Sequence, residues 1–124
     1  MTETGAEDGI LKKILEEYLS VEGVYAAALI QNDGFVIGIA NRRPLDTDAL
    51  GALASSALRF FEKGGVLVQT GPRRRIVFEY GGRAIILTPV SSEKFLAVVS
   101  ETPSVSGTLA YAVSQAGDRL AAAL

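Results

Sequence analysis

An uncharged stretch within one helical segment constrains the fold more than any other feature of the chain. Residues 49–58 read ALGALASSAL, and Asp46 or Thr47 before them provides a helix N-cap. Gly64 and Gly65 predict a stop near residue 63. Because a helix on the surface of a monomer normally shows a polar face, we expect this helix to be buried on two sides.

The two sides of this helix differ in the size of their residues. One side forms a stripe that we expect to face the core, made of Leu50, Leu53, Ala54, Ala57 and Phe61. The other side carries Gly51, Ser55 and Leu58. A chain of 124 residues forms one domain with little interior to spare, so we expect this second side to contact another subunit. A Leu58→Glu substitution should then give monomers.

The rest of the chain divides into short segments separated by turn residues. A flexible N-terminus over 1–7 precedes an amphipathic helix that Asp8 caps and Gly23 ends. Strands are predicted over 24–31, 35–40, 74–80, 83–89 and 94–100, and a last amphipathic helix contains residues 109–120. Residues 66–72 fit either a short strand or a packed connection, so the end of the second helix and the start of the third strand stay open.

The burial pattern of the strands predicts their order in a sheet. Residues 24–30, 84–87 and most of 94–100 are apolar on both faces, as central strands are, whereas residues 74–80 alternate as an edge strand does. With tight turns between successive strands, this predicts a five-stranded, mostly antiparallel sheet in the order 2-1-5-4-3. The fold class is α+β, with helices on both faces and the order helix-strand-strand-helix-strand-strand-strand-helix, as one domain over 8–124.

Composition excludes several classes of function. Hydrophobic residues make up 48% and charged residues 21%, so the chain is not disordered as a whole. It has no cysteine and no histidine, which removes thiol nucleophiles, imidazole catalysis and the usual metal ligands. The net charge of -2 gives no reason to expect nucleic acid as a partner. The longest apolar run, 24–30, is too short for a membrane span, so we expect a cytoplasmic protein without membrane insertion. We also expect neither a metal nor a cofactor.

The candidate chemical motifs have simpler explanations. Ser91 and Lys94 match the Ser-x-x-Lys spacing of acyl enzymes, but they fall in a predicted hairpin turn. The run of three arginines at 73–75 is expected to protect an edge strand, with docking of an acidic partner or an arginine finger as alternatives. Arg42, Arg43 and Arg59 are equally eligible for those roles. Asp46 and Asp48 are expected to cap a helix, and no phosphate-binding glycine motif is present. No residue is predicted to be catalytic.

One passage carries a resemblance to a known family. Residues 20–38, SVEGVYAAALIQNDGFVIG, hold a hydrophobic strand, an Asp-Gly turn and a second hydrophobic strand. Together with the low-charge second helix and the closing hairpin before an amphipathic helix, this passage resembles the Roadblock/dynein light-chain family over residues 8–124. The Gly64-Gly65 pair departs from the pattern, because many relatives continue the helix there.

The resemblance implies a function as well as a fold. Family members are dimeric scaffolds whose second helices pair and whose edge strands join into one sheet, and they commonly bind or regulate Ras-like small GTPases. On this chain the paired surfaces would include Gly51, Ser55 and Leu58 of the helix and Arg75, Val77 and Glu79 of the edge strand. The chain is therefore expected to be a non-enzymatic homodimeric adaptor that modulates the nucleotide state or location of a GTPase.

Two other functions remain open at this point. A small-molecule sensor module is one, although the predicted core is almost wholly aliphatic and offers no polar group to orient a ligand. A purely structural dimerisation subunit of a larger complex is the other. The sequence also does not separate a homodimer from a heterodimer with a related chain.

Overall fold

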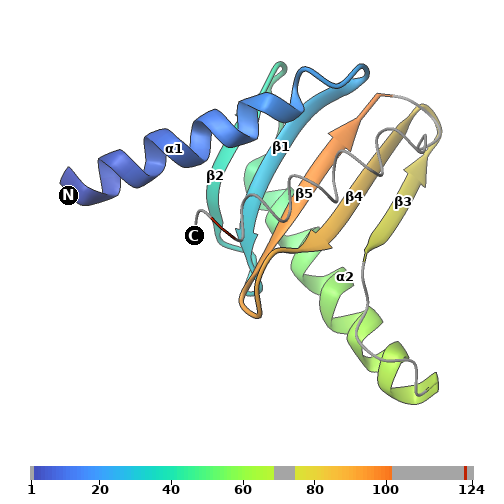
Figure 1. Cartoon of the computed structure of the whole chain (residues 1–124). Helices are drawn as coiled ribbons and strands as arrows, with labels where there is room; N and C mark the ends of the chain where they lie inside the picture. Colours follow the sequence, from blue (N-terminus) through green and yellow to red (C-terminus); the bar gives the residue numbers. More distant parts are fainter. Residues whose placement is uncertain (1, 69–74, 102–121, 123–124) are drawn as a thin grey trace.

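The computed structural model describes residues 2–68, 75–101 and 122. The chain starts with helix α1 (Thr2–Tyr18), continues with strands β1 (Val24–Gln31) and β2 (Val36–Asn41), and then forms helix α2 (Thr47–Val68). Strands β3 (Ile76–Tyr80), β4 (Arg83–Pro89) and β5 (Lys94–Ser100) follow. Figure 1 shows one twisted sheet with α1 and α2 on opposite sides of it. The helix predicted around 109–120 lies outside the described residues.

The five strands form one antiparallel sheet in the order β2-β1-β5-β4-β3, which confirms the predicted topology. Strands β1, β4 and β5 have the predicted bounds, and β2 starts one residue later than expected. The central pairing of β1 with β5 extends from Val24 opposite Ser100 to Gln31 opposite Lys94. Strands β2 and β3 are the edges, and β2 has a register shift opposite Leu29 and Ile30, an irregularity that commonly protects an edge.

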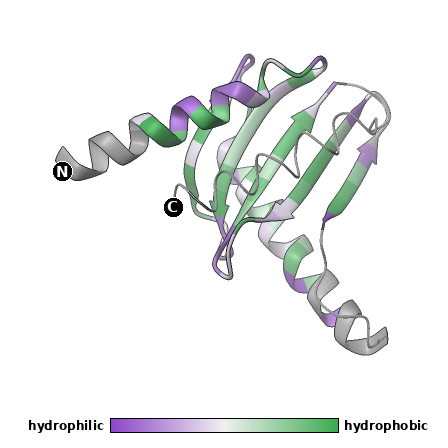
Figure 2. Ribbon diagram, in the orientation of Figure 1, coloured by the Kyte–Doolittle hydropathy of each residue, from purple (hydrophilic) through white to green (hydrophobic). Residues whose placement is uncertain are grey.

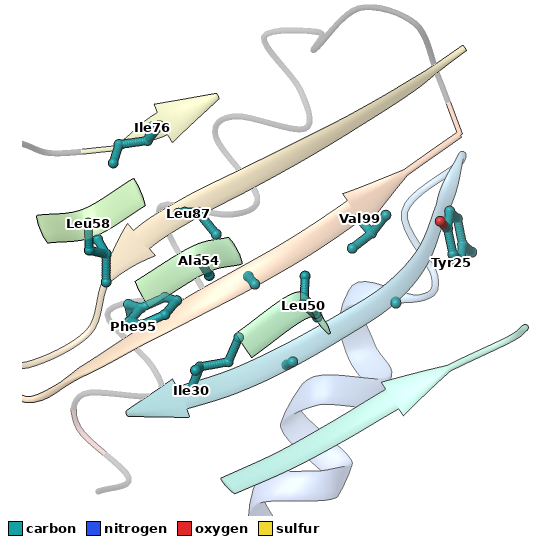
Figure 3. Close-up of a cluster of buried hydrophobic side chains, with 12 residues drawn as sticks. Tyr25, Ile30, Leu50, Ala54, Leu58, Ile76, Leu87, Phe95 and Val99 are labelled. Atoms are coloured by element: carbon teal, nitrogen blue, oxygen red, sulfur yellow. The ribbon is translucent and has the colours of Figure 1, made fainter. Parts of the chain in front are cut away.

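Alternate residues of the central strands build two cores. On one face Ala27 and Leu29 of β1 pack with the buried side of α1: Leu11, Ile14, Leu15 and Tyr18. On the other face Ala26, Ala28 and Ile30 pack with α2 and with Phe95. Figure 3 shows this second core, with Leu50, Ala54 and Leu58 of α2 lying along the sheet. In Figure 2 the hydrophobic residues of the central strands continue from strand to strand, and hydrophilic residues gather at the turns.

Both helices are longer than the sequence predicts. Helix α1 begins at Thr2 and not after Asp8. That residues 1–7 are flexible stays a prediction. Helix α2 continues through Gly64 and Gly65 to Val68, so the predicted stop near residue 63 is wrong. Glycine ends a helix only where it leaves helical geometry, and inside a helix it costs about 1 kcal/mol relative to alanine.

Among the described helices, none is both long and apolar enough to cross a membrane.

Candidate interaction surface

The start of α2 is fixed by Asp46. The backbone N–H of Ala49 donates to Asp46 Oδ1 at 3.0 Å, and the N–H of Leu50 donates to the Asp46 carbonyl oxygen at 3.0 Å. This arrangement confirms the predicted N-cap. Asp48 lies in the first turn, where a carboxylate interacts favourably with the helix dipole. The cap therefore sets where the first turn lies and, with it, which residues of α2 face the sheet.

The inner face of α2, defined as Leu50, Gly51, Ala54, Ser55 and Leu58, is buried within the chain. Leu58 and Ser55 are each only 3% exposed. The sequence predicts Gly51, Ser55 and Leu58 at a subunit contact, and the structure corrects this. These residues contact the sheet and the β1–β2 turn of their own chain, so they do not offer a surface to a partner.

Close contact between α2 and the β1–β2 turn explains the small residues at this place. A Cβ atom built on Gly51 would lie only 2.1 Å from the carbonyl oxygen of Gly34. Gly34 itself has a φ of +100°, a conformation that side-chain-bearing residues rarely adopt. The second surface that the small residues of α2 allow to approach is therefore a turn of the same chain.

The outer face of α2 is exposed and nearly free of charge. We define it as Ala49, Ala52, Leu53, Ser56 and Phe60, with Arg59 and Lys63 beside it. Leu53 is 41% exposed and Phe60 is 71% exposed. The prediction that Leu53 faces the core is wrong, whereas Leu50, Ala54 and Ala57 do pack in the core. The side chain of Phe61 lies outside the described residues.

Strand β3 provides a second exposed feature at the edge of the sheet. Arg75, Val77 and Glu79 are exposed, and Val77 is 42% exposed, whereas Ile76 and Phe78 contact the core on the α2 side. The predicted alternation of this edge strand is therefore confirmed. The strand starts at Ile76, and of the three arginines at 73–75 only Arg75 lies within the described residues.

Two arginines lie over the Tyr25 ring at the end of the sheet where β1 begins, and a third, Arg42, donates its backbone N–H to the Tyr25 carbonyl oxygen at 2.8 Å. The guanidinium carbons of Arg43 and Arg83 lie 5.5 and 5.4 Å from the centre of the Tyr25 ring, which is a cation–π distance. Arg83 Nη1 also donates to the Tyr25 hydroxyl at 3.3 Å. Arg43 forms an ion pair with Glu101, and Arg42 donates to the carbonyl oxygen of Leu19. We refer to Tyr25, Arg42, Arg43 and Arg83 as the arginine–tyrosine cluster.

The model of the Roadblock/LC7 domain family matches residues 10–100. The chain belongs to the Roadblock/LC7 family. This confirms the resemblance that the β1–β2 passage and the low-charge helix carry.

Solved structures agree with this assignment at the level of the fold. A structure of MglB with a tetrameric arrangement has a TM-score of 0.87 at 20% identity and covers 95% of this chain and 90% of that one. The gliding protein MglB from Thermus thermophilus has a TM-score of 0.86 at 20% identity with the same coverage. A Roadblock/LC7 domain from Streptomyces avermitilis has a TM-score of 0.80 at 21% identity and covers 88% and 92%. No curated protein sequence matches the chain.

The other predicted sites in this Roadblock/LC7 domain have structural roles. Ser91 Oγ accepts hydrogen bonds from the backbone N–H groups of Glu93 and Lys94, at 3.3 and 3.2 Å, inside the β4–β5 turn. This hairpin geometry is not the helix start that a serine-lysine nucleophile needs. Gly81 has a φ of +50° in the β3–β4 turn, as a turn glycine does. Across the described parts of the chain, no group of three or more acidic, histidine or cysteine side chains is placed to hold a metal ion.

Sequence reasoning did not find the arginine–tyrosine cluster or the outer α2 face. Arg42 and Arg43 stood among the candidate arginines, but Tyr25 and Arg83 are 58 positions apart and meet only because β1, β5 and β4 are neighbours. The missing charge of residues 49–58 singled out α2 but did not show which of its faces is exposed. Periodicity placed Leu53 and Leu58 on the wrong sides, because both sides of the helix carry leucine and alanine.

Proposed function

We propose that this chain is a non-enzymatic homodimeric adaptor that binds a Ras-like small GTPase and modulates its nucleotide state or location. Membership of the Roadblock/LC7 family supports the proposal, since the resemblance implies that members commonly bind or regulate such GTPases. The cytoplasm, where small GTPases act, is the proposed location. The observation that carries the dimer is the exposed, uncharged outer face of α2.

The outer α2 face has the chemistry of a helix-pairing surface. Leu53 and Phe60 leave apolar area in water, and burying it on association is favourable at about 25 cal/mol per Å². Ala49, Ala52 and Ser56 are small enough to let a second helix approach closely. Because the same face on a second copy is self-complementary about a two-fold axis, pairing of two α2 helices closes a dimer and leaves no repeating contact.

Strand β3 supports a matching contact at the edge of the sheet. If two β3 strands pair antiparallel about a two-fold axis at Val77, Arg75 of one copy lies opposite Glu79 of the other, and the reverse pair forms as well. Opposite charges directly across an antiparallel pair are favourable, and two apolar Val77 side chains meet at the centre. The strand is short, and Arg75 and Glu79 place charges near its two ends. These charges favour pairing with a strand of matching charge and disfavour pairing with other strands.

A rigid two-fold dimer provides a surface that can bind the switch segments of a GTPase. These segments differ between the GTP and GDP states, so a surface that binds them more tightly in one state shifts the nucleotide equilibrium by that difference in affinity. The dimer then offers either two equivalent sites or one site on its axis. A complex of one GTPase per chain without nucleotide preference would contradict this regulatory form of the proposal.

The decisive experiment is an affinity pull-down from the native cell extract with a GTP analogue and, in parallel, with GDP. Mass spectrometry of the bound fraction should identify a Ras-like GTPase that is enriched in one nucleotide state. Equal recovery of a large assembly in both states would show a structural subunit instead. Recovery of no GTPase in either state would contradict the proposal.

A further inference from the structure

The arginine–tyrosine cluster forms one wall of a hollow at the end of the sheet opposite the β1–β2 turn. The hollow has a volume of about 390 Å³ and is lined by the loop over 19–24 together with Tyr25, Arg42, Arg43 and Glu101. Figure 3 shows Tyr25 at the far end of the α2-side core, next to Val99 and away from α2 itself. Arg83 lies over the same tyrosine ring but is not part of the lining of the hollow. This surface is therefore separate from the outer α2 face.

The arginine–tyrosine cluster brings three positive charges together although the chain carries a net charge of -2. Glu101 neutralises Arg43. Within the part of the chain that the structure describes, Arg42 and Arg83 have no carboxylate within ion-pair distance; Arg42 contacts a carbonyl oxygen and Arg83 a phenol oxygen. Glu22 is exposed and also lines the hollow. Among the described residues, Glu22 and Glu101 balance Arg42 and Arg43 in the lining of the hollow, and Arg83 beside Tyr25 adds one positive charge.

The cluster presents hydrogen-bond donors that are already oriented. A guanidinium group carries only donors, and its planar fork matches a carboxylate. The Tyr25 ring holds Arg43 and Arg83 by cation–π contact, so less side-chain freedom is lost when either binds an anion. The Tyr25 hydroxyl accepts from Arg83, which leaves its own proton as a further donor. A ligand group that carries only hydrogen-bond acceptors, as a carboxylate does, would complement such a surface.

We propose that the arginine–tyrosine cluster docks an acidic segment of a protein partner, with Arg83 and Arg42 binding its Asp or Glu carboxylates. Several carboxylates along an extended chain suit this surface better than one compact anion, because Arg42 and Arg83 come from different elements, the β2–α2 loop and the start of β4. The proposal does not depend on the identity of the partner as a GTPase.

The test is an NMR titration of the full-length, ¹⁵N-labelled protein with a blocked acidic tetrapeptide, acetyl-DEDE-amide. The largest amide shifts are expected in residues 19–25, at 42–43 and at 83. Arg83→Gln, which keeps a donor for the Tyr25 hydroxyl but removes the charge, should weaken binding by about fivefold, as loss of a charge-assisted hydrogen bond does. Lys12→Gln, on the exposed side of α1, is the control and should bind as the unmodified chain does.

Three results would overturn the proposal. Shifts scattered over the whole surface, or none, would show that the cluster has only the structural role of tying β1, β4 and the loop together. An equal loss of affinity in Lys12→Gln would show non-specific attraction. Inorganic phosphate that shifts the same residues at lower concentration than the peptide would indicate a small-anion site instead. Thermal unfolding of Arg83→Gln, compared with the unmodified chain, shows that the variant is folded during the titration.

Discussion

The two faces of α2 have similar composition and opposite surroundings. The inner face carries Leu50, Leu58 and the small Gly51 and Ser55, all buried against their own chain. The outer face carries Leu53 and Phe60 with small residues between them, and it is exposed. Neither face has a charge. The comparison shows that a missing charge does not by itself tell what lies against each side of a helix, because one face packs on its own chain and the other is exposed.

The largest expected change in the free energy of unfolding comes from replacing a leucine by glutamate on the inner face of α2. The same replacement on the outer face is the comparison. Leu58→Glu puts a carboxylate among core side chains and should lower the free energy of unfolding by at least about 4 kcal/mol, because it adds the burial of a charge to the loss of a packed leucine. Urea unfolding measures the change. Leu53→Glu, five positions away and exposed, should change the free energy of unfolding of the single chain by less than about 0.5 kcal/mol, when both proteins are diluted below the concentration at which the chain dimerises. Similar losses in both variants would contradict the assignment of the two faces.

The contact between Gly51 and Gly34 predicts a second loss of stability on the inner face. Gly51→Ala should lower the free energy of unfolding by about 2 kcal/mol, because the new Cβ meets a backbone oxygen that has little freedom to move. Gly9→Ala in α1, where a Cβ meets nothing within 4 Å, is the control. It should raise the free energy of unfolding by about 0.5–1 kcal/mol through helix propensity. Stabilisation by both substitutions would mean that α2 does not lie so close to the turn.

The start of α2 sets the orientation of both faces, and Asp46 is its cap. Asp46→Ala should lower the free energy of unfolding by about 1 kcal/mol, since the N–H of Ala49 loses its acceptor. Asp46→Asn keeps a capping oxygen and should stay close to the unmodified chain. Thermal unfolding at one protein concentration compares the unmodified chain with the two variants. If Asp46→Asn loses as much stability as Asp46→Ala, the charge of Asp46 stabilises the helix and the hydrogen bond does not.

The smallest effect concerns the register of the proposed outer contact at β3. Arg75→Glu should weaken the dimer by about 0.5–1 kcal/mol, because it places two carboxylates opposite each other at each end of the paired strands. The exchange of both charges, Arg75→Glu with Glu79→Arg, should restore the affinity. Sedimentation equilibrium measures the dimer constants. A double variant no tighter than Arg75→Glu would exclude a register centred on Val77.

Most of the sheet could be predicted because its signals are local. The apolar runs of β1, β4 and β5 have turn residues at both ends, and residues apolar on both faces belong in the centre. The end of α2 could not be predicted, because Gly64 and Gly65 permit a stop without requiring one. The partners of Gly51 and Tyr25 depend on contacts between distant segments, such as the β1–β2 turn against α2 and β4 near β1, that no local pattern records.

The central claim is that the outer face of α2 joins two copies of the chain. Sedimentation equilibrium of the unmodified chain and of Leu53→Glu, over a range of micromolar concentrations, tests it most directly. The account predicts a species of twice the 13.1 kDa chain mass for the unmodified protein and a folded monomer for Leu53→Glu with an unchanged circular dichroism spectrum. A monomeric unmodified chain, or a Leu53→Glu variant that remains dimeric at the same affinity, would contradict it.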